Sequence, residues 1–181
     1  MQHILNTQIA LDEVDLVTPT TTQKYKLGEV IEVVEKAATS SETASYAVKK
    51  YMYVKSHTTL TAFQPYIIAF SSTAGSEVIT AAPLTLTAPG SLICVPQVAF
   101  TSGYYGFVQI QGDCSVLMTA ETYAVGDYLQ VLTAGTATVV DGSTGSTVVT
   151  TASMGICKTA GTTAVARSAY LLGAKAVVAS A

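Results

Sequence analysis

The sequence predicts an all-β protein, a compact β-barrel or sandwich of short antiparallel strands with an extended N-terminal arm. The chain of 181 residues contains 27 threonines, and β-branched side chains fit a pleated sheet better than a helix. Short apolar or alternating runs are separated by Gly, Pro and Ser turn signals, which favours a barrel or sandwich over βαβ units. Only 12% of the residues are charged, against roughly 25% in an average soluble domain, so the surface suits burial against partners.

The pattern divides the chain into an N-terminal arm (1–22), a β-rich domain (23–175) and a C-terminal tail (176–181). The arm has scattered apolar positions that allow a short helix from Ile9 to Val17, and "TPTTT" then breaks the pattern. Two alternatives stay open, because the arm can pack on its own domain or lie on a neighbouring subunit. The candidate interface residues in the arm are Ile4, Leu5, Ile9 and Leu11.

The first half of the domain contains four expected strands. "KYKLGEVIEVVEK" is assigned to a strand, although the spacing of its valines also fits a helix. After the polar loop "AATSSETAS", the run "YAVKKYMYVKS" alternates, with Tyr51 and Tyr53 on one face and Met52 and Val54 on the other. "QPYIIAFS" follows as a short apolar strand, and "LTLT" has the period of two that is typical of a further strand.

The second half begins with "GYYGFVQIQGDCSV", in which Val108 and Ile110 share one strand face. "AVGDYLQVLTAGTATVV" predicts a strand, a Gly-containing turn and a second strand. "TASMGICKTAGTTAVARSAYLLG" predicts the last two strands, joined at "TAGT".

The titratable residues form no recognisable catalytic motif, so we expect no enzyme and no cofactor. His57 is interpreted as a solvated turn residue, and a Cys–His dyad would require a cysteine beside it in space. Asp113 and Asp127 each follow a glycine and are interpreted as turn residues that cap nearby N–H groups.

The three cysteines, Cys94, Cys114 and Cys157, fit no zinc spacing and are expected to be small buried hydrophobes in a reducing compartment. The net charge of −3, without a basic cluster beyond Lys49-Lys50, argues against nucleic acid as a partner. The N-terminus has no signal-peptide pattern, and no run of 18 apolar residues predicts a membrane span.

The tyrosine content of the chain favours a binding function over catalysis. The chain has 10 tyrosines and no tryptophan, and tyrosine is enriched at protein interfaces. Tyr51, Tyr53, Tyr104 and Tyr105 are therefore candidate interface residues, with the edge of the core as the alternative location.

The order of these segments resembles the head decoration (cement) proteins of tailed bacteriophages over residues 24–173. Five phrases carry the resemblance: the "LG" that leads into the first strand, then "YMYVK", "GYYGFVQIQG", "VGDYL" and the closing "GICKTAGTTAVARSAYL". The matched positions are Tyr51, Tyr53, Val54, Lys55, Gly103, Tyr104, Gly106, Val108, Gln109, Gly112, Val125, Gly126, Asp127, Leu129, Gly155, Ile156, Thr159 and Leu171. Two positions depart from the family pattern, Phe107, where tryptophan is common, and Cys157, where a small residue is usual.

The resemblance implies a structural virion protein that is made in the host cytoplasm and binds the outer capsid surface. It implies two partners: the major capsid protein and the chain itself, as a homotrimer at three-fold and quasi-three-fold axes. Each trimer would clamp neighbouring capsid subunits and so stabilise the shell by multivalent contact. A head-fibre base or a glycan-binding virion surface module is the alternative, and a cysteine- or carboxylate-based hydrolase is the third hypothesis.

Overall fold

The computed structural model describes residues 2–4, 13–35, 48–68, 92–131, 139–141 and 153–173. Strands dominate these ranges, accompanied by one 3-10 helix. The elements are β1 (Gln2–Ile4), η1 (Glu13–Leu16), β2 (Val30–Glu35), β3 (Val48–Lys55), β4 (Tyr66–Ile68), β5 (Leu92–Cys94), β6 (Tyr105–Leu117), β7 (Tyr128–Val131), β8 (Val139–Asp141), β9 (Gly155–Cys157) and β10 (Ala166–Leu172). Within the described residues, the strands expected at 24–36, 46–56, 64–71, 103–116, 124–140 and 151–173 are found as β2, β3, β4, β6, β7–β8 and β9–β10. The "LTLT" strand and the glycine turn expected between β7 and β8 lie outside the described residues.

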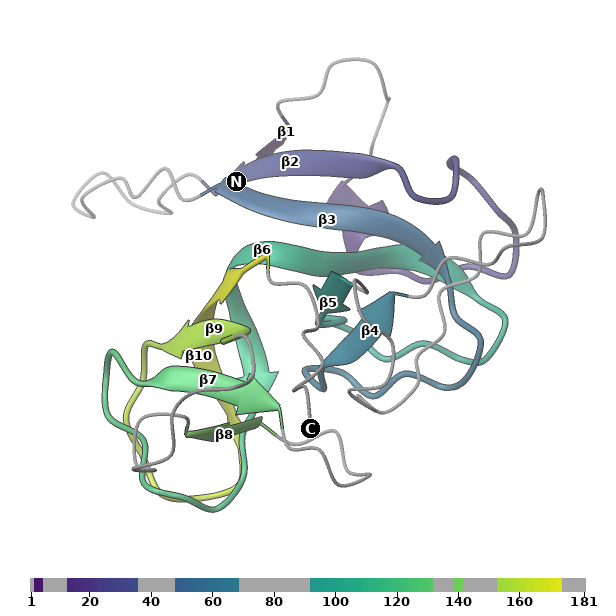
Figure 1. Ribbon diagram of the computed structural model, residues 1–181. Coiled ribbons are helices and arrows are strands. Elements are labelled where there is room, and N and C mark those ends of the chain that lie inside the picture. Colours follow the sequence, from purple (N-terminus) through teal and green to yellow (C-terminus); the bar gives the residue numbers. More distant parts are fainter. Residues whose placement is uncertain are drawn as a thin grey trace, which may run out of the picture.

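Eight of these strands form one antiparallel sheet in the order β1-β2-β3-β6-β10-β9-β7-β8, and β4 pairs with β5 in a separate ribbon. The order begins at β1 and ends at β8 without returning to its start, so the sheet is open and sandwich-like rather than a closed barrel. Figure 1 shows the sheet bending along β6, with the β4–β5 ribbon beneath the long β6 strand. The predicted all-β antiparallel class is therefore confirmed in its sandwich form.

Strand β6 joins the two halves of the sheet. Its first half pairs with β3, where Phe107 lies opposite Tyr53, and its second half pairs with β10, where Ser115 lies opposite Ser168. The register with β3 shifts between Lys50 and Tyr51, which marks a β-bulge. Bulges bend the strand that carries them and increase its twist. The bulge therefore allows β6 to pair with β3 in one half of the sheet and with β10 in the other half, although the two halves differ in orientation.

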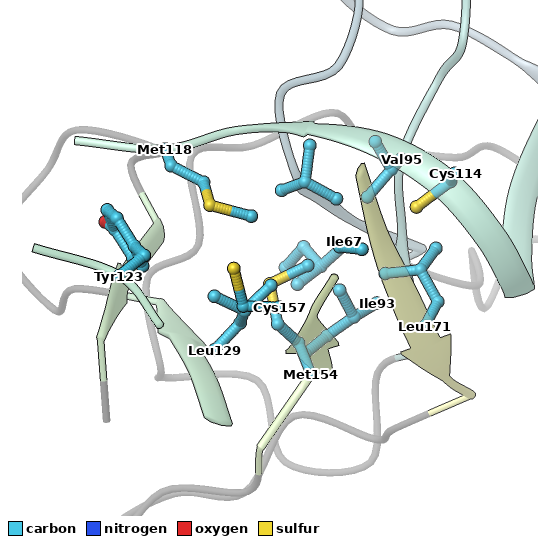
Figure 2. Close-up of a cluster of buried hydrophobic side chains, with 12 residues drawn as sticks. Ile67, Ile93, Val95, Cys114, Met118, Tyr123, Leu129, Met154, Cys157 and Leu171 are labelled. Atoms are coloured by element: carbon cyan, nitrogen blue, oxygen red, sulfur yellow. The ribbon is translucent and has the colours of Figure 1, made fainter. Parts of the chain in front are cut away.

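Three groups of buried side chains, called here the first, second and third cores, stabilise this arrangement. The first lies between β6, β7, β9 and β10 and includes Met118, Tyr123, Leu129 and Met154 (Figure 2). The second places Met52, Val54, Val108 and Ile110 against the β4–β5 ribbon and Phe100. The third lies on the other face of β3 and contains Leu16, Ile31, Val33, Tyr51, Tyr53 and Phe107. Strand β3 is therefore buried on both faces. Met52 and Val54 project into the second core, and Tyr51 and Tyr53 project into the third core.

The described part of the N-terminal segment packs on its own domain, one of the two predicted alternatives. Strand β1 pairs antiparallel with β2, and η1 buries Leu16 in the third core. Thr20 and Tyr105 exchange two backbone hydrogen bonds of 2.8 Å. The expected helix is confirmed only as the short η1, and residues 5–12 lie outside the described residues.

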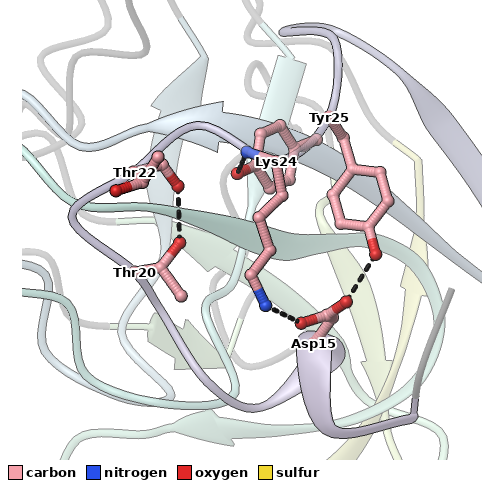
Figure 3. A network of polar contacts seen from close by, with 6 residues as sticks. Asp15, Thr20, Thr22, Lys24 and Tyr25 are labelled. Atoms are coloured by element: carbon pink, nitrogen blue, oxygen red, sulfur yellow. Dashed lines mark hydrogen bonds and ion pairs between the residues drawn. The ribbon is translucent and has the colours of Figure 1, made fainter.

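The Asp15 carboxylate links η1 to the segment that precedes β2 through two hydrogen bonds. Asp15 accepts a hydrogen bond from the Lys24 ammonium at 2.6 Å and another from the Tyr25 hydroxyl (Figure 3). The Asp15 side chain is only 12% exposed, so these contacts are partly protected from water. Tyr25 also packs edge-on against Tyr53, with ring centroids 5.2 Å apart, which connects this carboxylate to the third core.

Replacement of Asp15 by alanine is expected to lower the free energy of unfolding by about 1–2 kcal/mol, because two charge-assisted hydrogen bonds are lost. Urea denaturation followed by far-UV circular dichroism measures the change. The matched control is Glu32→Ala, which breaks a 2.7 Å ion pair with Lys50 between side chains that are 43% and 36% exposed. The control is expected to cost below about 0.5 kcal/mol. Equal costs for the two variants would contradict the role of Asp15.

Candidate functional site

The candidate interface tyrosines do not share one environment. Tyr51 and Tyr53 are 6% and 2% exposed within the third core, so the interface position predicted for these two is corrected to a core position. Their strand face is covered by η1 and by the residues that follow it, and this cover comes from a distant part of the sequence. Tyr104 and Tyr105 are half-buried. Tyr105 stacks on Tyr53 at 6.5 Å between centroids and has the Lys55 ammonium 5.3 Å from its ring centroid.

The candidate residues of the arm are only partly placed. Ile4 is the last residue of β1, where it pairs with Val33. Leu5, Ile9 and Leu11 lie outside the described residues.

The central phrase "GYYGFVQIQG" consists largely of residues that the fold requires. A Cβ on Gly106 would lie 2.8 Å from the Phe100 ring, and Gly112 has a φ of +93° against the backbone of β3. Gln109 is fully buried, and its side-chain amide donates to the carbonyls of Gln111 (3.1 Å) and Asp113 (2.8 Å). These hydrogen bonds span the bend of β6, so the phrase specifies the shape of the central strand.

Asp113 is not the turn residue that its position after glycine predicts. It lies within β6, and its carboxylate pairs with the Lys158 ammonium at 2.8 Å. The strand continues through Gly112 because glycine tolerates the positive φ that the bend requires. For Asp127 the prediction is confirmed, since its carboxylate accepts the Ala124 N–H at 2.6 Å across a turn.

The three cysteines are buried, as expected, and they form no disulfide with one another. Burial raises the pKa of the Cys114 thiol to about 12, and it also raises the pKa of Cys94. A thiol with a raised pKa stays protonated at neutral pH, and the protonated form is a poor nucleophile. His57 is an exposed residue after β3, and its carbonyl accepts the Ser102 hydroxyl at 3.0 Å, so the predicted turn position is confirmed.

We expect the three thiols to react with an aromatic disulfide reagent at least about 100-fold more slowly in the native protein at pH 8 than in urea, because all three are buried and the pKa values of Cys94 and Cys114 are raised.

The stability of the protein should also depend on alkaline pH. In the unfolded chain Cys114 ionises near its ordinary pKa of 9.0, whereas in the folded chain it ionises near 12. The contribution of this thiol is therefore complete below pH 9 and is lost as the pH rises toward 12. Urea midpoints at pH 8 and 10.5 for the wild type and Cys114→Ala measure the effect, and an equal fall in both would contradict it.

A shallow polar hollow opens over the second half of β6. It has a volume of about 320 Å³ and is lined by Lys49, Gln97, Asp113, Cys114, Ser115, Lys158 and Ser168. The Gln97 amide is fixed at its wall, because it accepts the Ser115 N–H at 3.0 Å and donates to the Ser115 carbonyl at 3.2 Å. No spacing in the sequence indicates this hollow, since β3, β6, β10 and the segments after β5 and β9 each supply part of it.

The same face of the sheet carries a row of larger side chains beside the hollow. Asp113 pairs with Tyr170, Tyr170 with Ile156, and Ile156 with Tyr128 across four neighbouring strands. Residues directly opposite each other in antiparallel strands project to the same face. Tyr170 and Ile156 are half-buried and Tyr128 is 51% exposed, whereas the neighbouring Ala169 and Leu171 are buried on the opposite face. We call the row and the hollow together the outer face.

No group of three His, Cys, Asp or Glu residues is arranged to hold a metal ion within the described ranges. None of the helices in the described part of the chain is long and apolar enough to cross a membrane.

Together, the fold and the outer face define a class, an all-β sandwich-like domain with a polar hollow on an exposed sheet face. No protein-family model and no curated protein matches the sequence. Among solved structures, the chain is similar to the N base of head fiber gp8.5 in bacteriophage phi29, with 15% identity and a TM-score of 0.44. The match covers 69% of this chain and 95% of that chain. At this distance the likeness assigns neither a family nor a function.

Proposed function

We propose that this protein is a structural component of a bacteriophage virion that binds the outer surface of the capsid as a decoration protein. The observation that carries the proposal is the position of the central phrase "GYYGFVQIQG", which shapes β6, the strand that joins both halves of the sheet. Six of the 18 residues that carry the resemblance to the decoration family lie in this phrase, and in this chain they help to set the course of the central strand.

The composition of the chain supports a role in contact rather than in catalysis. Charged residues make up 12% of the sequence, and interface cores are depleted in charge. The described cysteines are buried, and the Asp113 carboxylate is engaged by Lys158. These features support a function that consists of binding, without a chemical step.

More specifically, we propose that the protein forms a homotrimer at the three-fold and quasi-three-fold axes of the capsid. Each chain would contact the major capsid protein, so one trimer would clamp several capsid subunits after assembly in the host cytoplasm. Linking three modest contacts makes the second and third contacts intramolecular, which raises the overall affinity without a new contact.

Co-sedimentation tests the proposal. Purified protein is mixed with capsids that lack accessory surface proteins, in the immature and the expanded state, and the pellets are quantified. We expect saturable binding to at least one state, and capsids that are already decorated serve as the control. Absence of binding to either state would overturn the proposal. Light scattering of the free protein tests the trimer separately, and a stable monomer would contradict it.

A further inference from the structure

We infer that the outer face binds a carbohydrate, with Tyr170 as the stacking surface and the polar hollow as the hydrogen-bonding part. This inference goes beyond capsid attachment and does not depend on it. The outer face combines two features that sugars require: an aromatic ring for their apolar C–H faces, and mixed donors and acceptors for their hydroxyl groups.

The charges that line the hollow favour a neutral polyhydroxyl ligand. The hollow is lined by Lys49 on β3, by Lys158 just after β9, and by Asp113 on β6, whose carboxylate pairs with Lys158 at 2.8 Å. An anionic group would meet the Asp113 carboxylate, and a cationic group would meet two lysines, so either would be opposed by part of the lining. A hydroxyl is both donor and acceptor, and it can bond to a carboxylate on one side and to an ammonium on the other.

The hydrogen-bonding groups of the hollow are held in place before any ligand arrives. The Asp113–Lys158 ion pair has a length of 2.8 Å, and the Gln97 amide is fixed by two hydrogen bonds to Ser115. A carboxylate oxygen and an amide oxygen each retain acceptor capacity beyond one hydrogen bond. Preorganised groups lose little conformational entropy on binding, which is important for a weak polar ligand.

Tyr170 is positioned next to these groups. It lies directly opposite Asp113 in the register of β6 and β10, and neighbouring strands are about 4.8 Å apart. Tyrosine presents an apolar ring with a polar hydroxyl tip, so a sugar packed on Tyr170 would have its peripheral hydroxyls within reach of the hollow. Ile156 and Tyr128 extend the apolar row on the other side, which gives room for a second sugar unit.

The dimensions of the hollow fit a short saccharide. Its volume of about 320 Å³ is near the lower end of the roughly 300–1,000 Å³ that is typical of ligand sites. The hollow is shallow and polar, so we expect single-site dissociation constants in the range of about 0.1–1 mM.

The first experiment applies the full chain, multimerised on a fluorescent carrier, to an array of bacterial and eukaryotic oligosaccharides. Isothermal titration with the soluble form of the best array ligand follows. We expect saturable binding, a loss of affinity of at least about tenfold in Tyr170→Ala and in Asp113→Asn, and a change below about twofold in Tyr170→Phe. Val125→Ser is the matched control, since Val125 is 69% exposed and is not among the residues that line the hollow or form the row. Far-UV circular dichroism and thermal midpoints establish that each variant is folded.

Two results would overturn the inference: no glycan bound on the array, or glycan binding that persists in both Tyr170→Ala and Asp113→Asn. Failure of the array together with reduced capsid co-sedimentation of Tyr170→Ala would also overturn it and would assign the outer face to a protein partner. Conversely, glycan binding by a chain that does not sediment with capsids would support the inference and contradict the proposed function, so the two failures are distinguishable.

Discussion

Replacement of Gly112 by alanine is expected to lower the free energy of unfolding by about 2–4 kcal/mol, a large part of the roughly 5–15 kcal/mol that stabilises a typical domain. Two costs combine at this position. Gly112 has a φ of +93°, which is strained for any residue with a side chain. In addition, the new Cβ would lie 2.5 Å from the Val48 carbonyl oxygen and 3.0 Å from the Lys49 Cα, both of which are backbone atoms of β3.

Gly103→Ala is the matched control for this prediction. Gly103 has a similar φ of +84°, but a Cβ there would meet no atom within 4 Å. This control therefore reports the conformational strain alone, which we expect to cost about 1 kcal/mol. Urea denaturation of both variants separates the steric contribution from the strain. Equal destabilisation by the two substitutions would contradict the close approach of β6 to β3.

The strands themselves could be predicted because their signals are local. In β3 the alternation of Tyr51, Met52, Tyr53 and Val54 determines which side chains share a face, and the structure places them accordingly. Alternation does not reveal what covers each face. The cover of the tyrosine face comes from Leu16 and the segment after it, about 35 residues away in the sequence, so Tyr51 and Tyr53 could not be assigned to the core from their own strand.

Asp113 shows how a local signal can be misinterpreted. Glycine followed by aspartate is common in turns, but a glycine inside a strand pattern also indicates a bulge or a close approach of backbones. Here the second interpretation is correct, and β6 continues for five residues beyond Gly112. The outer face could not be predicted at all, because Lys49, Gln97, Asp113 and Lys158 become neighbours only through the pairing of distant strands.

Deletion of residues 1–22 is expected to destabilise the domain by at least about 3 kcal/mol, and not to remove a separable arm. The deletion removes Leu16, which is 5% exposed in the third core, and truncation of a buried leucine alone costs about 2–5 kcal/mol. It also removes both hydrogen bonds between Thr20 and Tyr105 and the Asp15 contacts with Lys24 and Tyr25. Tyr53 and Phe107 would then be exposed to water on the face that η1 now covers.

Deletion of residues 1–12 is the matched comparison, because it retains η1 and removes only β1 among the described elements. This shorter deletion should remain folded with a much smaller loss of stability, since β1 is a three-residue strand at the edge of the sheet. Urea midpoints of the two deletions and the full chain measure the difference. A 1–22 deletion as stable as the full chain would contradict the packing of η1 on the core. The folded 1–12 deletion also tests whether residues 1–12 dock on a neighbouring subunit. Reduced capsid co-sedimentation would support such docking, whereas unchanged co-sedimentation would contradict it.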